Sequence, residues 1–151
     1  FFAAQSSTYD FMTAEECEEY GVPYDMEVLE AAKDGWMNTI HAHGPNIMLE
    51  LLKNYPVDVF NWHAWETYPA VDEASLVTGK CLMGGLNRTD ITQCNRNAIR
   101  HQIFECFKMM KGRGQILTPG CVIRYPLDTK MLGFIKTTKE EIEQKMIVYS
   151  R

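Results

Sequence analysis

Short apolar runs alternate along this 151-residue chain with longer stretches in which apolar residues recur every three or four positions. The short runs predict buried β-strands at residues 1–5, 37–43, 57–62, 80–86 and 115–122. The longer stretches have the periodicity of amphipathic helices. We expect these helices at about residues 13–20, 23–34, 47–54, 72–78, 95–111 and 138–148. Strands that alternate with helices predict βαβ units and hence an α/β protein with a parallel sheet.

Cap residues mark several helix ends. Thr13 with Glu16, and Thr138 with Glu141, have the spacing of capping boxes, so the second pair is expected to open the last helix. Pro23 suits the first turn of its helix. Two architectures fit this order of elements, an open doubly wound sheet and a (β/α) barrel. The glycine-rich dinucleotide motif G-x-G-x-x-G is absent.

Composition and charge exclude several classes of protein. Hydrophobic residues make up 46% of the chain and charged residues 23%, which is typical of a globular domain and not of a disordered tail or a disulfide miniprotein. The net charge of −5 and the absence of a basic stripe argue against a nucleic-acid partner. No apolar run approaches the about 18 residues of a membrane span, and no signal-peptide pattern is present. Five cysteines without a C-x-x-C pair favour reduced thiols, so we expect a cytoplasmic protein.

Residues with metal-binding side chains lie at the ends of the predicted strands, where both architectures bind ligands. His41 and His43 are two positions apart in one strand, so their side chains point to the same face. With the thiolate of Cys121, from the last strand, they match the ligand chemistry of zinc and leave a fourth position free. The alternative is that both histidines are hydrogen-bonded pocket residues and that Cys121 is a buried, inert side chain.

Other polar or small residues at the strand ends are candidates for substrate binding and proton transfer. His63 and Glu66 are placed to move protons or hold a substrate, although a capped loop with packed indoles explains the same segment. Gly84 and Gly85 allow close approach of a ligand, although a β-bulge explains them equally well. The residues assigned to substrate binding are Gln5, Asn61, Trp62, Gly84, Gly85 and Asn87.

Four segments, taken together in their order and spacing, resemble the uroporphyrinogen decarboxylase superfamily. They are residues 40–44 (IHAHG), 57–63 (VDVFNWH), 82–87 (LMGGLN) and 116–123 (ILTPGCVI). The superfamily also contains corrinoid-linked methyltransferases, including those that methylate coenzyme M. The resemblance implies that residues 1–151 form one partial domain, about five C-terminal strands of a (β/α)8 TIM barrel without its N-terminal strands. The chain also opens on Phe1 without an initiator Met, and we expect it to be part of a longer protein. Exposed barrel edges then predict self-association.

The resemblance also implies a function. The methyltransferase branch binds zinc through a His-x-Cys pair on one strand and a Cys on the last strand. His41 and Cys121 match two of these positions, and His43 stands where the branch has a Cys. The implied activity moves a methyl group from a corrinoid protein to the thiol of a small-molecule substrate. The alternatives are a metal-independent decarboxylase of a porphyrinogen, with His41, His43 and His63 as acid/base groups, and a non-catalytic fragment.

Overall fold

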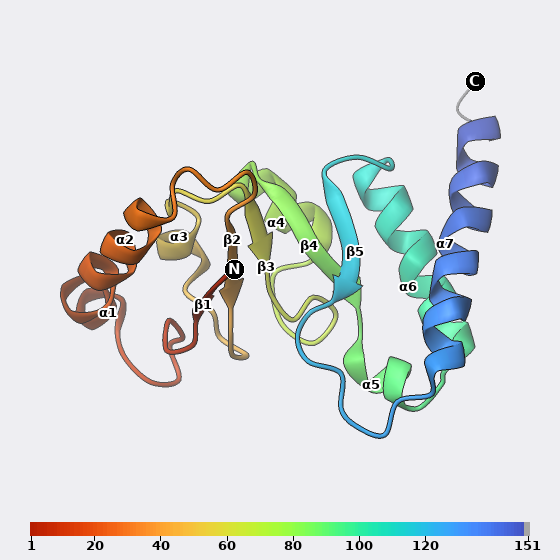
Figure 1. Cartoon of the computed structure of the whole chain (residues 1–151), viewed down its shortest axis with the longest axis horizontal. Coiled ribbons are helices and arrows are strands. Elements are labelled where there is room, and N and C mark those ends of the chain that lie inside the picture. Colours follow the sequence, from red (N-terminus) through yellow and green to blue (C-terminus); the bar gives the residue numbers. More distant parts are fainter. Residues whose placement is uncertain (150–151) are drawn as a thin grey trace.

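Five parallel strands form the single sheet of the computed structural model, which describes residues 1–149 and the side chains of residues 1–146. The strands are β1 (Phe2–Ala4), β2 (Thr39–Ala42), β3 (Val59–Asn61), β4 (Cys81–Leu86) and β5 (Gln115–Pro119). The helices are α1 (Ala14–Tyr20), α2 (Val22–Ala31), α3 (Leu49–Leu52), α4 (Val71–Thr78), α5 (Arg88–Thr92), α6 (Arg96–Met110) and α7 (Thr129–Tyr149). Figure 1 shows α1 and α2 beside the β1–β2 end of the sheet and α6 and α7 beside β5.

The strand order decides between the two expected architectures. The strands lie in the order β1-β2-β3-β4-β5, and every neighbouring pair is parallel. A doubly wound sheet would reverse its strand order at a switch point, whereas a barrel adds each strand beside the preceding one. The structure therefore confirms the α/β prediction and has the form of part of a TIM barrel.

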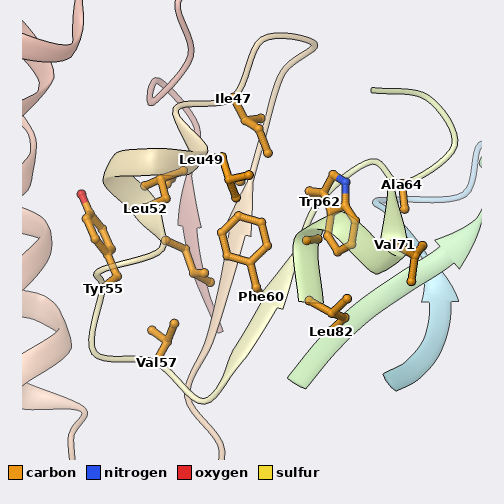
Figure 2. Close-up of a cluster of buried hydrophobic side chains, with 14 of the residues drawn as sticks. Ile47, Leu49, Leu52, Tyr55, Val57, Phe60, Trp62, Ala64, Val71 and Leu82 are labelled. Atoms are coloured by element: carbon orange, nitrogen blue, oxygen red, sulfur yellow. The ribbon is translucent and has the colours of Figure 1, made fainter. Parts of the chain in front are cut away.

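One face of the sheet is packed against helices by a large apolar core (Figure 2). Phe60 lies in β3, and Trp62 is the residue directly after this strand. Both side chains are fully buried, as is Leu82 of β4. Leu52 and Tyr55, in and after α3, close the same core. Because side chains alternate along a strand, Asn61 between the two aromatic residues faces the other side of the sheet.

A second apolar cluster holds α6 and α7 against the end of the sheet near β5. Its buried members are Leu86, Ile91, Ile99, Ile103, Met131 and Ile142. Phe134 and Ile135 of α7 pack against it, and the guanidinium groups of Arg96 and Arg100 lie 5.2 and 5.5 Å from the centre of the Phe134 ring. Leu117 of β5 packs against the same cluster, so these helices cover the strand at one edge of the sheet.

Several predicted boundaries are confirmed and others are wrong. The Thr13–Glu16 capping box is present. The last helix, however, begins at Thr129, because Met131, Phe134 and Ile135 form a helical stripe that packs on the second cluster; Thr138 is buried inside α7 and caps nothing. Strand β5 ends at Pro119, so Cys121 follows the strand, and α5 was not expected. Among residues 1–149, no helix combines the length and apolarity that crossing a membrane requires.

Candidate metal centre

Four potential metal ligands meet on the face of the sheet opposite the large core. One ligand atom from each of His41, His43, His63 and Cys121 lies within 4.8 Å of all the others. His41 belongs to β2, His43 follows it by two residues, and His63 and Cys121 come just after β3 and β5. The structure thus brings together three residues that the sequence assigned to a metal and one, His63, that it assigned to proton transfer.

His41 is held tightly in its place. The side chain is 4% exposed, and its Nδ1 lies 2.5 Å from Oδ1 of Asn61 on the neighbouring strand. Its Nε2 lies 3.4 Å from Nδ1 of His43, and the Phe1 ring stacks over it at a centroid distance of 6.0 Å. Burial lowers the pKa of His41, and the Asn61 hydrogen bond only partly opposes this effect. A neutral imidazole is the form that binds metals.

His63 carries a buried nitrogen with no partner. Its ring centroid lies 4.9 Å from that of His43 and 5.5 Å from that of His41. Within residues 1–146, nothing forms a hydrogen bond with its Nε2. Burial, followed by the charge of Arg88, lowers the pKa of His63 to about 4, so the ring is neutral at pH 7. An unpaired buried nitrogen costs about 1–3 kcal/mol, and a metal ion bound among these donors would supply the missing partner.

Gly120 brings Cys121 to the imidazoles. A Cβ atom at position 120 would lie 2.5 Å from the Trp62 carbonyl oxygen and 2.6 Å from Cα of His63. Only a residue without a side chain lets the turn after β5 pack this closely on the end of β3. Sequence analysis missed this role, although the Pro-Gly-Cys order after an apolar run was visible.

Glu66, predicted to be catalytic, is paired with Arg88. The Arg88 Nε lies 3.0 Å from Glu66 Oε1, and Nη2 lies 2.7 Å from Oε2. The Arg88 hydrogen bonds lower the pKa of Glu66, so this carboxylate is ionised at neutral pH and both of its oxygens are occupied. Glu66 in turn raises the pKa of Arg88, and the nearby Cys121 sulfur adds to that effect. The charge of Arg88 also lowers the pKa of His63 and of His41, so the pair acts electrostatically on the cluster.

The remaining predicted substrate-binding residues lie in several different environments. Trp62 is in the large core, where its Nε1 donates to the Pro69 carbonyl oxygen at 3.0 Å. Asn87 caps α5 through its Oδ1. Gly84 and Gly85 are buried, and a Cβ on Gly85 would lie 2.6 Å from the Cys106 sulfur, so packing of α6 accounts for that glycine. Gln5 is exposed just after β1. Of these residues, Asn61 alone is hydrogen-bonded to a member of the His/Cys cluster in the part of the chain described.

Comparison with known proteins identifies a solved structure with a similar fold. The sequence matches no protein-family model, and no curated protein matches it significantly. A solved structure, a methyltransferase from Methanosarcina mazei, superposes with a TM-score of 0.76 and is 14% identical in sequence. The match covers 93% of this chain and 41% of that chain, so this chain spans about two-fifths of the length of its structural neighbour. The chain therefore shares the fold of a methyltransferase over nearly all its length.

Proposed function

We propose that His41, His43, His63 and Cys121 bind a zinc ion, and that the protein transfers a methyl group from a corrinoid protein to a substrate thiol. The observation that carries the proposal is the convergence of these four ligand atoms within 4.8 Å, on a fold shared with a methyltransferase. The resemblance of four sequence segments to the uroporphyrinogen decarboxylase superfamily supports the same assignment.

The donor set fits zinc. Three imidazoles and one thiol are nitrogen and sulfur ligands of the kinds that zinc prefers, and four donors match its usual coordination number. The pKa values of His41 and His63 are lowered by burial, so neither ring must lose a proton at neutral pH before binding. The unpaired Nε2 of His63 is a further observation in favour of a bound ion.

The chain's own residues orient the site and set its charge. Asn61 holds the His41 ring and Gly120 permits the approach of Cys121. Arg88, which is paired with Glu66, lowers the pKa of the His63 imidazole through its charge. A catalytic zinc needs a position for its substrate, so the substrate thiol would have to replace one of the four protein ligands or enter as a fifth. Zinc bound in this way would lower the pKa of the thiol and so favour the thiolate nucleophile. A Zn²⁺ ion with one thiolate and three neutral imidazoles keeps a net positive charge, which favours an anionic acceptor. The methyltransferase branch has a second Cys where this chain has His43, so its centre would carry less positive charge.

The metal-independent decarboxylase is less well supported. A porphyrinogen carries several carboxylates, which need free cationic groups. Arg88, whose charge lowers the pKa of His63, is already paired with Glu66 through two nitrogens. Absorbance titration with a tetrapyrrole separates the hypotheses, since tight binding without metal would favour the decarboxylase.

Self-association through the sheet edges is also part of the proposal. In the part of the chain described, no strand pairs with the outer edge of β1 or of β5. Unpaired edges are templates for pairing with another chain. Light scattering during size-exclusion chromatography tests this idea, and a monomer at all concentrations would contradict it.

Metal analysis with a matched cysteine control tests the zinc centre. We expect about one zinc ion per chain in the unmodified protein and in Cys94→Ser, because Cys94 is an exposed thiol outside the cluster. Cys121→Ser should lose most of the zinc. Equal and negligible zinc in all three proteins would contradict the proposal. Loss of methylcobalamin absorbance on addition of a thiol and the zinc-loaded protein then tests methyl transfer.

A further inference from the structure

Asn61 lies between two neighbouring strands and uses both ends of its amide. Its Nδ2 donates to the Met83 carbonyl oxygen of β4 at 2.6 Å, and its Oδ1 lies 2.5 Å from Nδ1 of His41 in β2. In the sheet, His41 pairs with Asn61 and Asn61 pairs with Met83, so the three residues form one row across the strands. The side chain is 3% exposed, which leaves no free polar atom for a substrate.

The Met83 contact determines which way round the Asn61 amide is placed. A backbone carbonyl oxygen only accepts hydrogen bonds, so the amide group facing Met83 is the NH2 group. The amide oxygen therefore faces His41, and because this oxygen also only accepts, the proton of the neutral ring must sit on Nδ1. The lone pair is then on Nε2, the nitrogen that lies 3.4 Å from His43.

From this geometry we infer that Asn61 is a positioning residue, which fixes His41 in the Nδ1–H tautomer and turns its Nε2 lone pair toward the His/Cys cluster. Groups that hydrogen-bond the far nitrogen of a metal-binding histidine fix the ring and commonly change metal affinity by about 10- to 100-fold. The metal-affinity part of this inference rests on the proposed zinc centre, whereas the tautomer is a property of the metal-free protein. This role replaces the substrate contact that the sequence suggested for Asn61.

Nitrogen NMR of the metal-free protein, with labelled histidine, tests the tautomer directly. At pH 7.5 we expect Nδ1 of His41 to be the protonated nitrogen in the unmodified protein. Asn61→Leu should lose this preference. Asn38→Leu is the matched control. The Asn38 side chain also donates through Nδ2 to a backbone carbonyl oxygen, that of Ala32, but Asn38 lies outside the cluster. An Nε2–H tautomer in the unmodified protein, or no change in Asn61→Leu, would overturn the inference.

Zinc or cobalt titration of the same proteins gives the second readout, with urea unfolding of the metal-free forms as the stability measurement. Asn61→Leu should bind metal about 10- to 100-fold more weakly, and Asn38→Leu within about twofold of the unmodified protein. Asn61→Asp keeps the acceptor but loses the donor to Met83, so it should retain metal affinity while losing stability.

Affinity losses that simply follow stability in all variants would mean a merely structural role and would overturn the assignment. If the unmodified protein binds no metal but shows the Nδ1–H tautomer, the zinc centre fails and the positioning of His41 by Asn61 stands.

Discussion

The side chains on both faces of β3 and of the two residues after it are buried, but they differ in whether their polar atoms have hydrogen-bond partners. Phe60 and Trp62 face the helices, have no exposed surface and leave no polar atom unpaired, since the Trp62 indole donates to Pro69. Asn61 and His63 face the other way and are 3% and 8% exposed. Their polar atoms need partners, and Nε2 of His63 has none among the described residues. One face therefore packs the core, and the other carries polar side chains of which one nitrogen lacks a hydrogen-bond partner among the described residues.

This contrast separates packing from candidate function within four consecutive residues. Removing a side chain from the core face should cost stability and leave the ligand chemistry intact. Replacing the candidate ligand His63 on the polar face should cost little stability, or even increase it, and weaken metal binding. The variants below test this comparison or serve as its controls.

The largest effect is expected for Trp62→Ala. Trp62 is fully buried in the large core, and truncation of such a side chain costs about 3–5 kcal/mol through lost burial and a residual cavity. Urea unfolding of the metal-free protein measures the change. A loss below about 1 kcal/mol would contradict the assignment of Trp62 to the core, since even partial collapse of the cavity leaves a larger cost.

Gly120→Ala tests the close approach between the β5 turn and β3. The added Cβ would lie 2.5 Å from the Trp62 carbonyl oxygen, and overpacking of this kind costs about 1–3 kcal/mol. We also expect weaker zinc binding, because the turn that carries Cys121 must move away from His63. Equilibrium unfolding and metal titration measure the two effects.

Gly133→Ala is the control for that substitution. Gly133 lies inside α7, and a Cβ there would have no atom within 4 Å. Alanine is the better helix former by about 0.8–1 kcal/mol, so this variant should be more stable and bind zinc normally. Equal losses in Gly120→Ala and Gly133→Ala would show that contact with β3 is not the cause.

His63→Leu should stabilise the metal-free protein while weakening its response to zinc. The leucine removes a buried nitrogen that lacks a partner, whose cost is about 1–3 kcal/mol, and the replacement is of similar size. Thermal unfolding with and without zinc measures both effects. If the metal-free variant is less stable than the unmodified protein, His63 Nε2 is not unpaired. If zinc raises the Tm of the variant as much as that of the unmodified protein, His63 is not a zinc ligand.

The smallest effect concerns the charged pair at the border of the polar face. Arg88 lowers the pKa of Glu66 from its ordinary 4.5, so the pair stabilises the fold above about pH 4.5 and loses this contribution as pH falls through the lowered pKa. Because both side chains are partly exposed, Glu66→Gln should cost at most about 1 kcal/mol at pH 7. The difference from the unmodified protein should shrink as the pH falls below about 4.5 through the lowered pKa, and urea unfolding at pH 7 and at a series of lower pH values checks this. A difference that persists in acid would assign the effect to packing.

The spacing of apolar residues predicted most of the helices and strands, because this spacing reflects the local geometry of each element. Alternation along β3 and the three-to-four spacing in α6 follow from local backbone geometry, and each can be recognised without knowing what packs against it. The error at α7 has the same origin. The Thr138–Glu141 spacing suggested a helix start, but the contacts of Met131 and Phe134 with α6 begin the helix a full two turns earlier.

Residue type and position at the strand ends were enough to predict the candidate ligands. The sequence could not predict that they lie within 4.8 Å of one another. By itself, the sequence determined the alternating elements, the apolar and polar faces of each strand, and the presence of His41, His43 and Cys121 at the ends of two strands. The tertiary structure alone decided that His63 joins the cluster, that Asn61 is hydrogen-bonded to His41, and that Gly120 lets the turn with Cys121 pack on the end of β3. These contacts join residues from different strands, so they depend on strand order, register and close backbone packing, which no local pattern encodes.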